Sequence, residues 1–485
     1  MRGLVTGEAA MQLTPRSTPR LPRVALNHAE MVAKGMEEMG FSASDSIWKA
    51  ETCPTWLGGV HVAVAMFLAV LPGTFLYLLW GFWNLSVPLR WLGEKPYQSW
   101  PLETQWAHIA SESLSDAYCQ LLAPLFLYFI HGGHCHVPLL WNLPLLFLPG
   151  IYLVTAQLLG FYDPDSFIAH VPLNVLWVLS VVANGICFGC YAESRRQMNL
   201  ALAFVLTILL PVATANAVFY LVFPHYISSD SSVWHKGFVV GFVVPTSFFF
   251  SQFTTRQCCL SLIGSGRHPG CVGRLFVFAA VLESFARRAL LCGVQDLRLM
   301  CLSSVALGLT DTLAQLSVDL RDGLIFAASC RQMDEGFFEH PGRRRLRADS
   351  LLLHFVCEHL AISTLSSLAI LVQLVNLHRT LHSVIWSLAG FFMQTAVRLI
   401  FDVIVFTLEG RVGCLARSLF RLERWHGIPV QEVWWKCRQD MLCFSVHVSL
   451  IVAVYGQFFF KSFFEKSLLL SFGSCDSDCG HELTE

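Results

Sequence analysis

Residues 275–316 read LFVFAAVLESFARRALLCGVQDLRLMCLSSVALGLTDTLAQL. The stretch is apolar and long enough to cross a bilayer twice, since one helical crossing takes about 20 residues. It nevertheless contains six charged side chains: Glu283, Arg287, Arg288, Asp296, Arg298 and Asp311. The apolar runs before it, between Trp56 and Phe253, contain no Asp, Glu, Lys or Arg. The sequence therefore divides into a neutral part and a charged part, and this stretch begins the charged part.

The composition is typical of a membrane protein. Hydrophobic residues make up 54% of the 485 residues and charged residues only 14%, whereas soluble domains carry about 25% charged residues. The mean hydropathy of +0.54 is too high for a soluble fold to cover its surface with polar side chains. The formal net charge of -1 gives no indication of nucleic-acid binding. We therefore expect a multi-pass integral membrane protein, of the plasma membrane or an internal membrane, whose main partner is the lipid bilayer.

Eleven apolar runs are candidates for transmembrane helices, which favours an all-α polytopic membrane helix bundle. They lie at 56–83, 117–133, 137–160, 171–191, 199–223, 237–255, 275–293, 299–316, 350–376, 383–408 and 441–460. The alternative is nine crossings, with 275–316 folded as a single hairpin at the membrane interface.

The distribution of Lys and Arg indicates the orientation. With a cytoplasmic N-terminus, 23 of the 33 basic residues fall on the cytoplasmic side and 7 on the opposite side, and the other three lie within helices. Membrane proteins carry such an excess on their cytoplasmic side. We therefore expect an odd number of crossings, with the C-terminus on the opposite side. Both ends of 275–316 are then cytoplasmic, whether or not it crosses the membrane.

These patterns predict four parts of the chain. They are a disordered basic cytoplasmic tail (1–52), neutral transmembrane helices (53–255), charged transmembrane helices with basic cytoplasmic loops at 317–349 and 409–440 (256–460), and a short external tail (461–485). The longest external segment, 84–116, contains three Trp and is expected to form a loop or a short helix against the membrane interface.

Charged side chains inside the apolar runs are the first candidates for function. Each unpaired charge at the centre of a membrane helix costs about 2.5–3.5 kcal/mol, so such residues usually face the bundle interior or a water-filled path. We predict a polar pathway formed by seven residues: Glu283, Arg287, Arg288, Asp311, Glu358, Arg398 and Asp402. Their carboxylates would exchange protons or cations, and their guanidinium groups would be counter-charges or anion contacts.

Helical spacing predicts some of the ion pairs in this pathway. Two pairs of opposite charge are four residues apart and should face each other: Glu283 with Arg287, and Arg398 with Asp402. The alternative role for these pairs is only to hold helices together. Arg288 points about 100° away from Arg287, so we expect its partner on another helix, either Glu358 or Asp402.

Basic residues at the cytoplasmic ends of helices are candidates for contacts with anionic lipid headgroups. They form two groups: Arg343, Arg344 and Arg345, and then Arg417, Arg421 and Arg424. The second group falls on one face of an amphipathic segment, 411–436, of the kind that lies at the headgroup level. Each basic residue near the surface contributes about 1 kcal/mol to such binding. Simple orientation charge is the alternative explanation for both groups.

Histidines are spaced in a way that loosely resembles the histidine boxes of membrane desaturases and hydroxylases. They occur in three groups: His131, His134 and His136; His354 and His359; and His378 and His382. The predicted topology puts the last group about 30 Å from the others, across the membrane. One metal ion therefore cannot use all three groups, and we predict no metal and no other cofactor.

Three kinds of function remain open from the sequence. The first is a transporter or channel-like carrier of a small solute or ion that uses the carboxylates of the predicted pathway. The second is a membrane-embedded lipid-modifying enzyme, and the third is a sensory or structural membrane protein without transport activity. We favour the first, because intramembrane ionisable residues commonly mark ion and substrate paths.

Overall fold

The computed structural model describes most of the predicted helical part of the chain. The described ranges are 56–86, 97–130, 137–163, 167–191, 197–222, 238–264, 272–292, 297–318, 341–375 and 381–420, with 235, 321 and scattered positions from 430 to 446. The predicted tails (1–52 and 461–485) lie outside the described residues, as does most of the predicted helix at 441–460.

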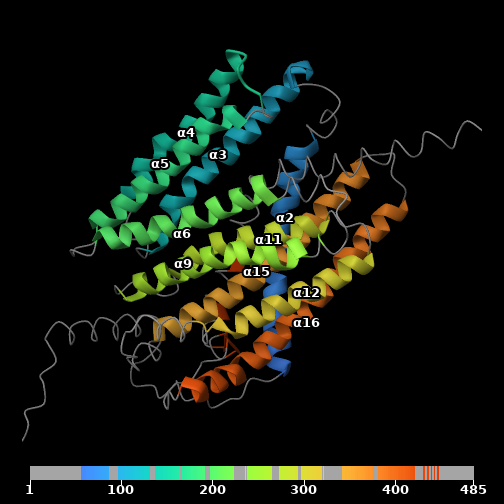
Figure 1. Cartoon of the computed structure of the whole chain (residues 1–485). Helices are drawn as coiled ribbons and strands as arrows, with labels where there is room; N and C mark the ends of the chain where they lie inside the picture. Colours follow the sequence, from blue (N-terminus) through green and yellow to red (C-terminus); the bar gives the residue numbers. More distant parts are fainter. Residues whose placement is uncertain are drawn as a thin grey trace, which may run out of the picture. The chain divides into compact units, whose positions relative to one another are not determined.

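The described part of the chain is helical throughout, as the sequence predicts (Figure 1). Its α-helices are α2 (Trp56–Ser86), α3 (Leu102–Ile130), α4 (Val137–Leu158), α5 (Phe167–Tyr191), α6 (Gln197–Ala217), α9 (Val244–Gly264), α11 (Val277–Cys292), α12 (Leu297–Leu316), α15 (Pro341–Val375) and α16 (Leu381–Phe420). Short helical turns add Tyr97–Ser99, Val218–Val222, Val239–Val243 and Arg274–Phe276.

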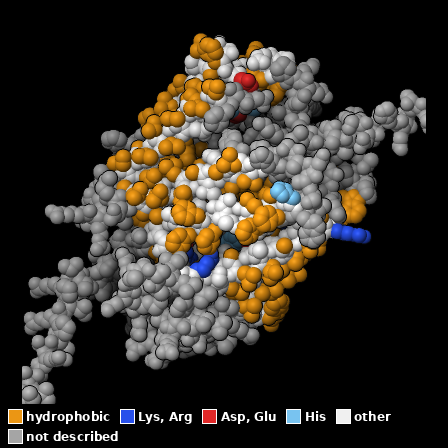
Figure 2. Space-filling model, in the orientation of Figure 1, with side chains coloured by type: hydrophobic (Ala, Val, Ile, Leu, Met, Phe, Trp, Pro, Cys, Tyr) orange, Lys and Arg blue, Asp and Glu red, His pale blue; other side chains and the backbone are white. Residues whose placement is uncertain are grey.

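The outer faces of several helices are more apolar than their buried faces. In α12, Leu302, Leu309 and Leu313 are exposed, whereas Ser304 and Asp311 are buried. A soluble helix has the opposite arrangement, with its apolar stripe facing the core. On the face of the molecule that Figure 2 draws, hydrophobic side chains cover much of the described surface. These outward apolar faces are suited to contact with lipid rather than water.

Four helices are long and apolar enough to cross a membrane. These spans are Trp56–Leu76, Ile168–Cys187, Leu297–Leu316 and Val384–Glu409, and two shorter apolar helices cover Asn142–Leu158 and Ala201–Ala217. The finding supports an integral membrane protein with several crossings. It does not reach the predicted eleven, in part because α11 has only 16 residues and because most of the predicted helix at 441–460 lies outside the described residues.

The helices with intramembrane charges pack on one another. α11 is only 16 residues long and is enclosed by α6, α9 and α15. α12 packs along α16, and α15 contacts both α16 and α2. The stretch 275–316 therefore forms two helices whose main contacts are with other helices.

The structure corrects two predicted helix boundaries. α3 begins at Leu102 rather than near residue 117, so part of the segment 84–116, which the sequence predicts to be a loop or a short helix at the interface, belongs to this longer helix. The helix therefore carries Glu112 and Asp116 ahead of its apolar part. α16 continues to Phe420, and residues 411–420 extend a membrane helix rather than starting a separate amphipathic one. In both cases the helix continues beyond the end of its apolar run.

Contacts at the helix ends agree with the predicted alternation across the membrane. Tyr97 lies against Tyr162, and their two segments are both predicted to be external. Arg347, at the start of α15, pairs with Glu409 at 3.0 Å, and both are predicted to be cytoplasmic. In each of these two contacts, both residues come from segments assigned to the same side.

Gly308 allows α12 and α16 to approach closely, next to Asp311. A Cβ atom at this position would overlap the ring of Phe401, with 2.6 Å to Cε2. We predict that Gly308→Ala lowers the free energy of unfolding by about 1–3 kcal/mol, because overpacking moves one helix away from the other. Gly241→Ala is the control, since a Cβ there meets nothing within 4 Å. Denaturant unfolding in detergent measures both variants, and equal stabilities would contradict the prediction.

Candidate functional site: a buried charge cluster

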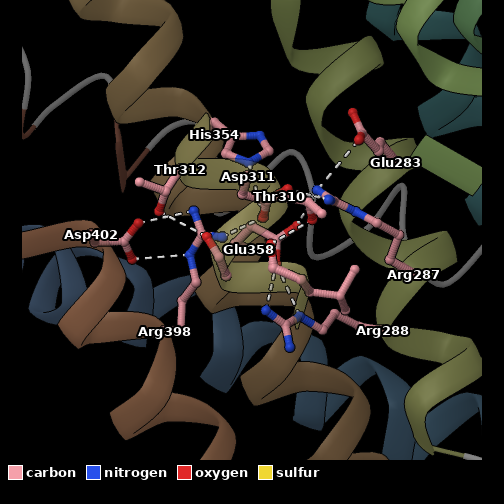
Figure 3. Close-up of polar contacts among 12 residues, drawn as sticks. Glu283, Arg287, Arg288, Thr310, Asp311, Thr312, His354, Glu358, Arg398 and Asp402 are labelled. Atoms are coloured by element: carbon pink, nitrogen blue, oxygen red, sulfur yellow. Dashed lines mark hydrogen bonds and ion pairs between the residues drawn. The ribbon is translucent and has the colours of Figure 1, made fainter. Parts of the chain in front are cut away.

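All seven residues of the predicted pathway lie in one cluster between α11, α12, α15 and α16 (Figure 3). This buried charge cluster comprises Glu283, Arg287, Arg288, Asp311, Glu358, Arg398 and Asp402. None of its members is more than 6% exposed. Four helices therefore supply charges to one water-poor site: the consecutive α11 and α12, and α15 and α16 from further along the chain.

Arg287 connects three carboxylates. Its Nη1 donates to Asp311 Oδ1, and its Nη2 donates to Glu358 Oε1 at 2.9 Å. The same Nη2 lies 3.4 Å from Glu283, the partner four residues before it that the helical spacing predicts. A single guanidinium thus links α11 to α12 and to α15.

Asp311 is held between two arginines on different helices. Its Oδ1 accepts from Arg287 of α11, and its Oδ2 accepts from Arg398 of α16. No partner for Asp311 is expected on its own helix, and both partners come from the packing of other helices. Charge-assisted hydrogen bonds of this kind are about twice as strong as neutral ones.

Glu358 satisfies the two adjacent arginines of α11. Its Oε2 accepts from Nε of Arg288 at 2.9 Å, and its Oε1 accepts from Arg287. Nη1 of Arg288 also lies 3.5 Å from the side-chain oxygen of Gln394. The prediction that Arg288 needs a partner on another helix is confirmed, and Glu358 is that partner.

Arg398 and Asp402 form the bidentate pair that their spacing predicts. Nε of Arg398 donates to Oδ2 at 3.1 Å, and its Nη2 lies 2.9 Å from Oδ1. His359 of α15 places its Nε2 3.0 Å from Oδ2 of Asp402. This pair therefore anchors Arg398 while its Nη1 reaches Asp311.

His354 completes the cluster but makes no hydrogen bond within the described part of the chain. It is 3% exposed, and neither of its ring nitrogens has a hydrogen-bond partner among the described residues. Its Nε2 lies 3.6 Å from Oδ2 of Asp311, too far for a hydrogen bond and close enough for an ion pair. From the sequence, this histidine is a candidate only as a metal ligand, together with His359. Its position beside Asp311 could not be predicted, because it depends on the packing of α12 against α15.

Asp311, His354 and Glu358 are also close enough together to share a metal ion, with ligand atoms within 4.8 Å of one another. Both carboxylates, however, already accept hydrogen bonds from guanidinium groups. The positive charges of Arg287 and Arg398 oppose a divalent cation at this point. His131, His134 and His136, like His378, lie outside the described residues, so their predicted separation is not tested.

The charges of the cluster do not balance. With all side chains of the cluster ionised and both histidines neutral, four carboxylates face three guanidinium groups. One negative charge remains in a site that water barely reaches. An uncompensated buried charge is costly, so binding one proton or one monovalent cation stabilises the cluster.

Arg345 is the predicted lipid-contact arginine whose side chain the structure describes, and its ion pair with Asp349 is outside the buried charge cluster. Arg345 donates to Asp349 at 2.9 Å, one turn along α15. Arg343 and Arg344 are in the first turn of α15 and Arg417 is in α16, with side chains that the structure does not describe. Arg421 and Arg424 lie outside the described residues. Their contact with lipid stays a prediction.

A second polar group, which the sequence reading missed, lies at the predicted external end of α3. His108 is 3.3 Å from Glu112, and Tyr162 donates its phenol proton to Glu112. Burial raises the pKa of Tyr162, and the charge of Glu112 raises it further, so the phenol keeps its proton. His108, Glu112 and Asp116 are each four residues apart, a spacing that places them on one face of a helix. The hydropathy pattern does not reveal this, because it starts the helix only near residue 117.

Comparison with known proteins does not assign the chain to a family. No family model matches it, and neither curated proteins nor solved structures provide a match. The chemistry of the buried charge cluster is therefore the basis for a functional assignment.

Proposed function

We propose that the chain is a proton-coupled membrane carrier in which the buried charge cluster is the proton-exchange site. The observation that carries the proposal is the charge imbalance of four carboxylates against three arginines. A cluster that served only to join helices has no need of an excess charge. A carrier does need one, because it must bind and release an ion during each cycle.

Asp311 is the position we assign to the exchanged proton. His354, with neither ring nitrogen hydrogen-bonded in the described part of the chain, lies beside its Oδ2 and can pass a proton to it. A sodium ion fits this position less well, because a metal cation needs several oxygen ligands and both carboxylate oxygens of Asp311 already accept hydrogen bonds from Arg287 and Arg398. The mobile element would be α12, which carries Asp311 and whose opposite face is apolar.

Proton-driven uptake tests the proposal. Proteoliposomes with a trapped pH indicator are given D-glucose, glycine, pyruvate or inorganic phosphate under an inward proton gradient. Wild type should acidify the lumen with at least one solute, and Asp311→Asn should reduce this rate at least about tenfold. Glu103→Gln, at an exposed position, should behave as wild type. A sodium gradient alone should drive no uptake. A wild type that matches protein-free liposomes with every solute would overturn the proposal.

The second candidate is a structural membrane protein, and one observation favours it. Every charged side chain of the cluster is buried and contacts at least one of opposite charge, as in a dry core. Cys357 distinguishes the two, because it is completely buried beside Glu358. A carrier must hydrate this region in some states, so a small water-soluble methanethiosulfonate should modify Cys357 slowly, as detected by mass spectrometry. If the protein is a structural membrane protein with a dry core, Cys357 should stay unmodified while the protein is folded.

A further inference from the structure

We infer that the carrier takes a small oxyanion, a carboxylate or phosphate, which replaces the Asp311 carboxylate between Arg287 and Arg398. This inference rests on the proposed function and adds the class of substrate. Its starting point is that Asp311 itself is bound as such a substrate would be. Each of its oxygens accepts a hydrogen bond from a different guanidinium group.

Both arginines stay anchored if Asp311 is removed from them. Arg398 keeps its bidentate pair with Asp402, at 2.9 and 3.1 Å. Arg287 keeps Glu358 at 2.9 Å and Glu283 at 3.4 Å. Two guanidinium groups fixed in this way form a ready site for carboxylate or phosphate oxygens, which arginine binds with matching geometry.

Arg287 and Arg398 stabilise the ionised form of Asp311 as long as it lies between them. Asp311 therefore takes up its proton only after a movement of α12 withdraws it from the two arginines, which frees the site and leaves Asp311 as a neutral acid. The neutral acid no longer offsets two positive charges, so an external oxyanion competes for them. The charged and titratable groups facing Asp311 from the neighbouring helices are Glu283, Arg287, His354, Glu358, Arg398 and Asp402.

The charge of the site fixes the stoichiometry. One proton and one monovalent anion together leave the total charge of the cluster unchanged. The electrostatic free energy needed to reorient the site across the membrane is then the same for the resting site and the loaded site. We therefore expect electroneutral symport of one proton with one monoanion.

The experiment uses the same proteoliposomes, with pyruvate and phosphate as separate arms and D-glucose and glycine as neutral solutes. For at least one of the two oxyanions, we expect one proton to enter with each anion taken up. The uptake rate should not depend on membrane potential. Asp311→Asn should lose net proton-driven uptake but retain exchange of labelled oxyanion across the membrane, with no dependence on pH. Arg398→Lys keeps the charge but not the two-pronged geometry, and should raise the half-saturating concentration at least about tenfold.

Two controls separate the possible failures. Arg298→Lys, at an exposed position of α12, should leave uptake unchanged. Proton-coupled uptake of D-glucose or glycine without uptake of either oxyanion would overturn the inference and leave the proposed function standing. Absence of any proton movement in wild type would overturn both. Arg398→Lys with normal oxyanion affinity would also contradict the inference.

Discussion

Replacing Arg287 by Met should lower the free energy of unfolding by about 3–5 kcal/mol, the usual cost of removing one partner from a buried ion network. Arg287 is 1% exposed and lies against three carboxylates, on α11, α12 and α15. Without it the cluster has two excess negative charges. Denaturant unfolding of the detergent-purified protein measures the loss.

The control for Arg287→Met is Arg298→Met. Arg298 is exposed at the start of α12, so its replacement should change the stability by no more than about 0.5 kcal/mol. Adding Asp311→Asn to Arg287→Met should restore part of the lost stability, because it removes one of the stranded charges. Equal, small effects of Arg287→Met and Arg298→Met would show that the guanidinium does not stabilise the bundle.

The second large effect is expected at Glu358 and should be reversible by a second substitution. Among the described residues, the guanidinium of Arg288 contacts Glu358 and, at 3.5 Å, the side-chain oxygen of Gln394. Glu358→Met removes the first of these and leaves only the second. We expect a loss of about 3–5 kcal/mol. The double variant Arg288→Met/Glu358→Met should recover most of it, because replacing a buried ion pair by apolar side chains is often neutral or stabilising.

A double-mutant cycle makes this second prediction quantitative. The coupling energy between positions 288 and 358 should exceed about 2 kcal/mol, near the upper end for residues in direct contact. Glu103→Met combined with Arg288→Met serves as the uncoupled control, since Glu103 is exposed on α3. Additive losses at 288 and 358 would contradict the pairing.

Much of the cluster was predictable because its charges stand out in apolar helices. The helical period pairs Arg287 with Glu283, and the two lie at 3.4 Å. The same period directs Arg288 toward another helix, where it pairs with Glu358. These predictions succeed because a charged side chain in a membrane helix usually faces the bundle interior and pairs with an opposite charge, which leaves few possible partners.

The parts that could not be predicted depend on how helices pack. Nothing in the local sequence places His354 beside Asp311, since the two residues lie on α15 and α12. The hydropathy pattern also hid the start of α3, because residues such as Gln105 are polar and yet buried. A polar residue that faces the inside of a bundle is read as loop when only hydropathy is considered.

Infrared difference spectroscopy tests the central claim, that the cluster holds one exchangeable proton on Asp311. On acidification, wild type should show the C=O stretching band of one buried protonated carboxyl group. The band should be absent in Asp311→Asn and unchanged in Glu103→Gln, whose side chain is exposed. A band that persists in Asp311→Asn, or wild type without any such band, would contradict the account.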